Sequence, residues 1–299
     1  MTAFDRLEAV SLDELVSAAS LLTRVDRKYV VPRADLEAVL ARLDEGTRVL
    51  EIDSARNFAY ESVYFDTPDL LSFRMAAQPR RRRFKLRTRS YLDTGSSYLE
   101  IKTRGARGTT VKERDEYDPE RRGELTADAR DDVAGALSTI GVASERAEEL
   151  DATLVTRYRR ATLLAPDGSG RATVDTDLEW IEPDGNGFAL PRLAIIETKS
   201  GSSASAVDRL LWRSGHRPAT VSKYATGLAA LHPELPGNRW ARLLRGPFSD
   251  SRDSLRPTPV RLGSGLAPTG PVAAPTGHLA ARTPSTTSRI EEASCSDAA

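Results

Sequence analysis

Charged residues recur at every second position, or in phase with that spacing, in six short segments of this chain. A spacing of two is the side-chain period of a β-strand, so each segment predicts charges on one face of one strand. The residues between them are mostly apolar or β-branched and suit a face that packs on a core. The charged positions are Arg24, Asp26 and Lys28; Arg83, Lys85, Arg87 and Arg89; Glu100 and Lys102; Lys112, Arg114 and Glu116; Arg171 and Asp175; Glu197 and Lys199.

Six such strands in one domain favour a sheet whose second face is a shared charged surface. Its simplest closed form is a barrel with a charged lumen. We therefore expect a mainly β (α+β) fold, an eight-stranded antiparallel closed β-barrel with flanking helices. Strands are expected over residues 23–31, 58–65, 82–91, 97–103, 109–117, 151–164, 170–181 and 193–199, and helices over 11–19, 33–43, 70–75, 126–140, 203–214 and 222–231.

The organisation along the chain predicts three parts. Residues 1–20 are expected to hold an N-terminal helix that a capping box opens at Ser11. The β-rich domain is expected over residues 21–245. From residue 246 the composition shifts to Pro, Ser, Thr, Gly and Ala, which predicts a disordered tail over 246–299.

Composition excludes several classes of protein. Lys and Arg number 43 and so do Asp and Glu, so net charge gives no reason to expect nucleic-acid or membrane binding. No apolar run approaches the ~20 residues that span a bilayer, and residues 1–10 show no secretory signal. We expect a cytoplasmic protein. The one cysteine, Cys295, argues against a disulfide framework, and three scattered histidines argue against a zinc site.

The basic positions predict a bound polyanion. Like charges facing one another across a sheet destabilise it, and buried cations without partners are costly. A multivalent anion removes this conflict, and phosphate suits a mixture of arginine forks and lysine point charges. A solvated basic face remains the alternative for the Arg83–Arg89 run taken alone.

The acids among these bases allow two interpretations. Asp26, Glu100, Glu116, Asp175 and Glu197 balance charge, or some of them hold a hard cation. Mg²⁺ or Mn²⁺ is typically bound by one or two carboxylates together with phosphate oxygens and water. The sequence has no P-loop, dinucleotide fingerprint, nucleophile elbow or zinc-protease helix. Phosphoryl transfer by positioning and electrostatics, which requires no protein nucleophile, is compatible with these absences.

Several short motifs in order resemble the VTC domain of the triphosphate tunnel metalloenzyme (CYTH-like) superfamily. The resemblance covers about residues 21–231. It implies an eight-stranded antiparallel tunnel lined with Lys and Arg that binds triphosphate and a divalent metal. The motifs are Arg24–Val31, Tyr64–Pro68, Lys85–Arg89, Leu99–Lys102, Val174–Asp177, Ile196–Lys199 and Ser222–Tyr224.

The resemblance implies a polyphosphate polymerase that transfers the γ-phosphate of ATP to a growing polyphosphate chain with Mn²⁺ or Mg²⁺. Glu197 would hold the metal, with Glu100 as a second candidate. Periodicity alone does not decide whether Tyr158 and Arg160 or Arg157 and Arg159 point inward. The catalytic cations would be Lys28, Arg87, Arg89, Lys102, Lys112, Arg160, Arg171, Lys199 and Lys223, and further phosphate-binding residues would be Arg24, Lys85, Arg114, Tyr158 and Ser222.

One departure from the superfamily bears on the reaction. Its first strand carries a Glu-x-Glu-x-Lys run, whereas this chain has Arg24-x-Asp26-x-Lys28. The missing acid weakens the case for a two-metal hydrolase. A triphosphatase and a non-catalytic polyphosphate-binding module remain as alternatives. A nucleic-acid binder has thin support because only Phe84 alternates with the basic run. The partners expected are ATP and inorganic polyphosphate or triphosphate, with a membrane-protein partner left open.

Overall fold

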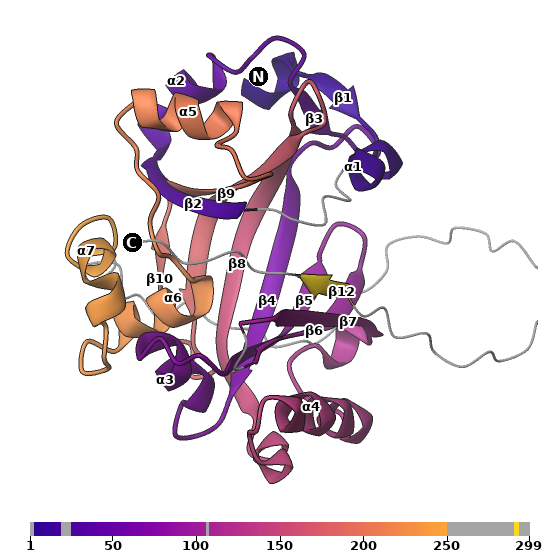
Figure 1. Ribbon diagram of the computed structural model, residues 1–299, viewed down its shortest axis with the longest axis vertical. Coiled ribbons are helices and arrows are strands. Elements are labelled where there is room, and N and C mark those ends of the chain that lie inside the picture. The colour runs from indigo at the N-terminus through magenta and orange to yellow at the C-terminus, as the bar shows by residue number, and fades with distance from the viewer. Residues whose placement is uncertain (1–2, 19–24, 106–107, 250–289, 293–299) are drawn as a thin grey trace, which may run out of the picture.

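The computed structural model describes residues 3–18, 25–105, 108–249 and 290–292. A large, mainly antiparallel sheet with flanking helices dominates it (Figure 1). Neighbouring strands follow the order β12-β7-β6-β5-β4-β8-β9-β11-β2. The eight long strands match the eight predicted: β2 (Val25–Pro32), β4 (Phe58–Asp66), β5 (Arg83–Tyr91), β6 (Ser96–Arg104), β7 (Thr110–Tyr117), β8 (Asp151–Leu164), β9 (Gly170–Ile181) and β11 (Leu193–Ser200).

Four short strands add to the sheet beyond the prediction. β1 (Glu8–Val10) pairs in parallel with β3 (Arg48–Leu50), which runs antiparallel to β8 and so ties the N-terminal segment to the sheet. β10 (Gly187–Leu190) pairs with β9, and β12 (Ile290–Glu292) pairs with β7.

The closed barrel is the part of the fold prediction that is wrong. No pairing joins β7 to β2 within the residues described above. The outer edge of β7 carries β12 instead. On β2, the carbonyl oxygen of Lys28 accepts a hydrogen bond of 2.7 Å from the backbone N–H of Ala219. Alternation predicts strands and their faces, but it contains no information on which segments take the two outer edges.

The open sheet is nevertheless strongly curled. Lys85 Nζ on β5 donates to Ser222 Oγ at 3.0 Å, only three residues after Ala219 contacts β2. The charges of Lys28 on β2 and of Glu197 on β11 also act on the Lys85 amine. Five strand spacings separate β2 from β5, which would be ~24 Å in a flat sheet. The sheet therefore wraps round until β2 approaches β5, and residues 219–222 bridge the two strands.

Six helices begin and end close to their predicted positions, and a seventh over residues 241–244 was not predicted. A capping box opens the first, since Ser11 and Glu14 exchange hydrogen bonds. Thr126, Ser205 and Ser222 cap three others through their side chains. The helices are α1 (Leu12–Ala18), α2 (Arg33–Leu40), α3 (Leu71–Ala77), α4 (Ala127–Thr139), α5 (Ala206–Arg213), α6 (Lys223–Leu231) and α7 (Ala241–Leu244), with 3-10 turns η1 (Ala3–Arg6), η2 (Pro119–Arg121), η3 (Ser144–Ala147) and η4 (Asn238–Trp240).

The apolar faces of the strands pack outward against these helices. Tyr29 and Ile196 are buried in one cluster with Leu211 of α5. Leu86 and Ile101 belong to a second cluster with residues of α4. In Figure 1, α2 and α5 cover one end of the sheet and α4 lies at the other. The outward packing leaves the charged positions on the concave side.

A third hydrophobic cluster packs α6 and the residues up to Phe248 against the sheet. Trp180 Nε1 donates to the carbonyl oxygen of Lys223 at 2.7 Å, and a Cβ on Gly227 would lie 2.1 Å from the indole. Phe248 is 1% exposed and packs on Trp180 with ring centroids 5.4 Å apart. Packing thus continues three residues past the predicted boundary at 245. The prediction of disorder for the tail falls largely on residues 250–289 and 293–299, which lie outside the described residues.

Candidate functional site

Cross-strand register places the alternating charges on one face of the sheet, which we call the inner face. Arg87 lies opposite Glu100, which lies opposite Arg114. At the other side of the curl, Glu197 lies opposite Lys28. The inner face comprises Asp26, Lys28, Lys85, Arg87, Arg89, Glu100, Lys102, Lys112, Arg114, Tyr158, Arg160, Arg171, Asp175, Glu197 and Lys199.

The open question of strand β8 is resolved by its contacts. Arg160 Nε lies 2.6 Å from Asp175 Oδ1, on the inner face. Arg157 instead contacts Glu61 on the outer face, with Nε 2.8 Å from Oε2. Arg159 donates to the backbone oxygen of Asn57. Tyr158 and Arg160 are thus the inward pair.

The N-terminus of α6 adds two predicted residues to the inner face. Ser222 accepts from Lys85, and Lys223 Nζ forms an ion pair with Asp175. Of the predicted site residues, all but Arg24 are brought together on this surface. Arg24 lies outside the described residues.

Glu100 is the most heavily paired acid of the inner face. Its side chain is 4% exposed, and Arg87 Nε and Nη2 lie 2.9 and 2.6 Å from Oε2. Arg89 lies 3.4 Å from Oε2, and Lys112 and Arg114 lie 3.7 and 3.9 Å from Oε1. Burial acts to raise the pKa of Glu100, but these cations outweigh it and the pKa is lowered. The carboxylate stays ionised and compensates four cations.

Asp175 forms the second centre. Its side chain is 2% exposed, and Arg160 binds it through two nitrogens, at 2.6 and 2.8 Å. Lys223 completes the cluster from α6. Against the effect of burial, Arg160 and Lys223 lower the pKa of Asp175. The cluster joins β8, β9 and α6 through one carboxylate.

Glu197 forms the third centre, with Lys199 on Oε1 and Lys28 Nζ 3.8 Å from Oε2. Lys199 also pairs with Asp26. Burial opposes ionisation of Glu197, but Lys28 and Lys199 hold its pKa well below the usual range. The Glu197 side chain is 20% exposed, and its Oε2 is reached by Lys28 only beyond hydrogen-bond distance. This oxygen remains open to a further partner.

Lys85 differs from the other lysines discussed so far. No carboxylate pairs with it among residues 3–18, 25–105 and 108–249, and its hydrogen-bond partner is the neutral hydroxyl of Ser222. Burial, followed by the charges of Arg87, Lys28 and Lys102, lowers its pKa well below the ordinary value of 10.5. An anion placed here would relieve this repulsion.

Tyrosines form part of the inner face that sequence reasoning missed, apart from Tyr158. Tyr64 accepts a hydrogen bond of 3.2 Å from Arg87, and Tyr60 stacks on Tyr158 with ring centroids 5.3 Å apart. Arg114 lies over the ring of Tyr98 at 3.8 Å. The rings hold the guanidinium groups in place through cation–π contacts. The signal was the spacing of two between Tyr60, Ser62 and Tyr64, the same period that located the charges.

The carboxylates of the inner face offer few ligands for a divalent cation. In the part of the chain that the structure describes, no three His, Cys, Asp or Glu side chains form a group suited to a metal ion. Glu197 fits as a single carboxylate ligand because, among the described residues, one of its oxygens has no cation within hydrogen-bond distance and its side chain is 20% exposed. Glu100 fits less well, because its Oε1, which also has no hydrogen bond within the described ranges, is buried and has two cations, Lys112 and Arg114, at 3.7 and 3.9 Å. Lys28 and Lys199 would repel a bare cation at Glu197, so a metal fits there only together with phosphate.

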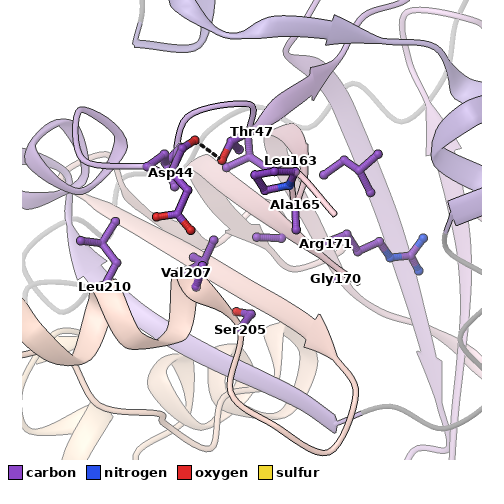
Figure 2. Close-up of a pocket in the computed structure, with 14 residues that line it drawn as sticks. Asp44, Thr47, Leu163, Ala165, Gly170, Arg171, Ser205, Val207 and Leu210 are labelled. Carbon is purple, nitrogen blue, oxygen red and sulfur yellow. Dashed lines mark hydrogen bonds between the residues drawn. The ribbon is translucent and has the colours of Figure 1, made fainter. Parts of the chain in front are cut away.

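A separate pocket has one residue of the inner face, Arg171, in its lining. Figure 2 shows it between the β8–β9 turn, the segment before β3 and the start of α5, with Val207 and Leu210 facing Asp44 and Thr47. Its volume of about 30 Å³ is sufficient for about one water molecule. It is too small for a triphosphate and is therefore not a candidate site for one.

Residues 23–232 match the VTC domain, which is most of the chain. The chain belongs to the VTC domain family. No curated protein matches this VTC domain protein. No helix in the described ranges has the length and apolarity that crossing a bilayer requires.

Three solved structures resemble the VTC domain protein at low identity. A proposed adenylyl cyclase from Hippeastrum with a dominant triphosphatase activity has 19% identity and a TM-score of 0.42, covering 69% of this chain and 96% of that one. A proposed adenylate cyclase from Vibrio parahaemolyticus has 13% identity and a TM-score of 0.38, covering 69% and 98%. A conserved protein of unassigned function from Pyrococcus furiosus has 14% identity and a TM-score of 0.34, covering 64% and 88%.

Proposed function

We propose that this protein is a polyphosphate polymerase that transfers the γ-phosphoryl group of ATP to the end of an inorganic polyphosphate chain. The observation that carries the proposal is the inner face, where cations from β2, β5, β6, β7, β8, β9, β11 and α6 converge. Membership of the VTC domain family supports it. Lysine and arginine distributed around a curl suit a linear anion with a charge on every unit.

Charge balance supports a multivalent anion as the ligand. The inner face holds more lysine and arginine side chains than carboxylates, and within the described residues Lys85 donates to the neutral hydroxyl of Ser222 and pairs with no carboxylate. An anion among Lys85, Lys28 and Lys102 would remove the repulsion that lowers the pKa of Lys85. A triphosphate engages several of these cations simultaneously, whereas a monophosphate engages few.

The transfer itself requires little chemistry from side chains. An oxygen of the terminal polyphosphate unit bonds to the γ-phosphorus of ATP, and the bond from that phosphorus to the β–γ bridging oxygen breaks. ADP leaves with the electron pair, and no proton has to move. The inner face would hold donor and acceptor in line and stabilise the charge on the transferred group.

The carboxylates support transfer to phosphate over attack by water. Activating a water requires a base with affinity for a proton. The pKa values of Glu100, Asp175 and Glu197 are all lowered by neighbouring cations, which makes each a weak base. A phosphate oxygen needs no such activation because it is already ionised.

Mn²⁺ or Mg²⁺ bound by Glu197 and phosphate oxygens would neutralise part of the charge on the transferred group. Replacement of Glu197 by Ala is expected to abolish turnover while leaving triphosphate binding in place, because the lysines remain. Unchanged ATP consumption in Glu197→Ala would refute the role of Glu197. The measurement is ATP consumption with Mn²⁺, alongside thermal stabilisation by tripolyphosphate.

The decisive experiment is incubation of the purified full chain with ATP and Mn²⁺, with and without a short polyphosphate primer, resolving products by length on a gel. A ladder of chains with ADP is the expected result. Orthophosphate without chains would replace the proposal with a triphosphatase. Stabilisation by tripolyphosphate without any turnover would replace it with a binding module.

A further inference from the structure

The α3–β5 loop carries a second basic surface outside the inner face. Arg80, Arg81 and Arg82 are consecutive and exposed. Together with Arg74 of α3 they line an open pocket of about 620 Å³ over Leu71 and Met75. That volume lies within the range of ligand sites. We call Arg80, Arg81 and Arg82 with this pocket the arginine patch.

The patch is poorly neutralised. Arg74 pairs with Asp69, but within the described part of the chain no carboxylate pairs with Arg80, Arg81 or Arg82. The guanidinium of Arg80 is instead oriented by a neutral group, with Nε and Nη2 3.1 and 3.0 Å from Gln78 Oε1. An ordinary solvated surface interleaves both signs of charge. Three neighbouring cations without an acid indicate an anionic ligand.

The patch continues a column of cations that leads from the inner face. Arg89, Arg87, Lys85 and Arg83 follow one another along the same side of β5, and Arg83 donates to the carbonyl oxygen of Arg80 at 3.1 Å. Ser72 of α3 fixes the two parts together, since its Oγ donates to Phe84 O at 2.8 Å. Lys85 and Arg81 are four residues apart, and four residues of extended chain span at most ~13 Å. The patch therefore begins within a short stretch of polymer from Lys85.

We infer that the arginine patch binds the part of the polyphosphate chain that extends beyond the inner face, at the β5 end. This inference rests on the proposed function and adds to it the end of the inner face at which the polymer leaves. The lining contains no Phe, Tyr or Trp, so it offers nothing for nucleic-acid bases to stack on. A linear anion without bases is the ligand that this chemistry fits.

The test compares two triple variants of the full chain. Arg80→Gln/Arg81→Gln/Arg82→Gln removes the patch. The control, Arg42→Gln/Arg209→Gln/Arg213→Gln, removes the same charge from exposed positions around α2 and α5, at the end of the sheet opposite α4 (Figure 1). The probes are long-chain polyphosphate, tripolyphosphate and single-stranded RNA, each titrated at several salt concentrations.

The patch variant is expected to bind long-chain polyphosphate about tenfold more weakly, a loss of about 1.4 kcal/mol. The slope of log affinity against log salt should fall by about 2, for three lost phosphate contacts. Stabilisation by tripolyphosphate should stay at the wild-type value, because the inner face is intact. With ATP, products should become shorter.

An unchanged affinity for long-chain polyphosphate in the patch variant would overturn the inference, as would an equal loss in the control. RNA bound as tightly as polyphosphate, and lost in the same variant, would overturn the choice of ligand. Failure of the proposed function is distinguishable, because it would appear in the wild-type protein as no ladder from ATP.

Discussion

Replacing Glu100 by Gln tests whether the inner face is held together by its own acids. Glu100 is 4% exposed and compensates Arg87, Arg89, Lys112 and Arg114, whose exposed fractions run from 14% to 37%. Breaking a buried ion pair costs about 3–5 kcal/mol, and the partial exposure of these partners argues for the lower end. At about 3 kcal/mol, the melting temperature of the ligand-free protein should fall by about 6–12 °C.

The same substitution should strengthen anion binding. The four cations lose their resident carboxylate, so a bound triphosphate would compensate them in its place. Tripolyphosphate should bind about tenfold more tightly, a gain of about 1.4 kcal/mol. The stabilisation of Glu100→Gln by tripolyphosphate should therefore exceed that of the wild type, as measured by differential scanning fluorimetry across a concentration series.

Glu61→Gln is the matched control. Glu61 is also a buried acid held by two arginines, Arg122 and Arg157, each 2.8 Å away, but it lies on the outer face. Glu61→Gln should lower the melting temperature without changing the rise in melting temperature that tripolyphosphate produces. An unchanged melting temperature in Glu100→Gln, or a tripolyphosphate shift no larger than that of the wild type, would refute the reasoning.

The effect of Glu100→Gln should depend on pH with a definite sign. The pKa of Glu100 in the folded protein lies below its ordinary value of 4.5. A lowered carboxyl pKa stabilises the fold fully above the unfolded value, and this stabilisation is lost as pH falls through the folded value. The difference in stability between wild type and Glu100→Gln should be full above about pH 4.5 and shrink as the pH drops below it.

Two further substitutions test Lys85 and α6. Lys85→Met should raise the melting temperature of the ligand-free protein, because the neighbouring cations repel the Lys85 amine. It should also weaken tripolyphosphate binding about tenfold, as measured by calorimetry. In the wild type, tripolyphosphate binding should weaken as the pH rises through the lowered pKa of Lys85, because only the charged amine attracts phosphate. Equal affinity in Lys85→Met would contradict this role. Gly227→Ala should destabilise by about 1–3 kcal/mol in urea denaturation because its Cβ would overlap Trp180. Gly135→Ala in α4, whose Cβ meets no atom within 4 Å, should be neutral or stabilising, and equal losses in the two variants would argue against steric overlap.

The alternation of charges predicted six of the eight long strands and which of their residues share a face, because side-chain direction follows directly from spacing. It could not orient β8. Arginines lie on both faces of that strand, Arg157 and Arg159 on one and Arg160 on the other, and only the pairing with Asp175 identifies Arg160 as inward. The strands of three or four residues, such as β1 and β3, are too short to show a period.

The sequence also could not predict which charged residues form ion pairs with one another. Nothing in the spacing distinguishes Glu100, which contacts four cations, from Glu197, which keeps one oxygen open. These differences arise from which strands lie opposite after the sheet curls. The bridge from Lys28 to Ser222 has no sequence signal either, since one of its two contacts is made by backbone atoms.

The carboxylates of the inner face neutralise several of its cations before any ligand binds. Every incoming anion competes with Glu100, Asp175 and Glu197 for cations that these acids hold at hydrogen-bond or ion-pair distance. An anion with one or two charges would form no more ion pairs with those cations than the three carboxylates already form, so it would bind weakly. A chain with a charge on every unit offers many contacts at once and exceeds them. If the inner face binds polyphosphate as proposed, these acids would set a minimum charge that a ligand must carry, and longer chains would bind in preference to shorter ones.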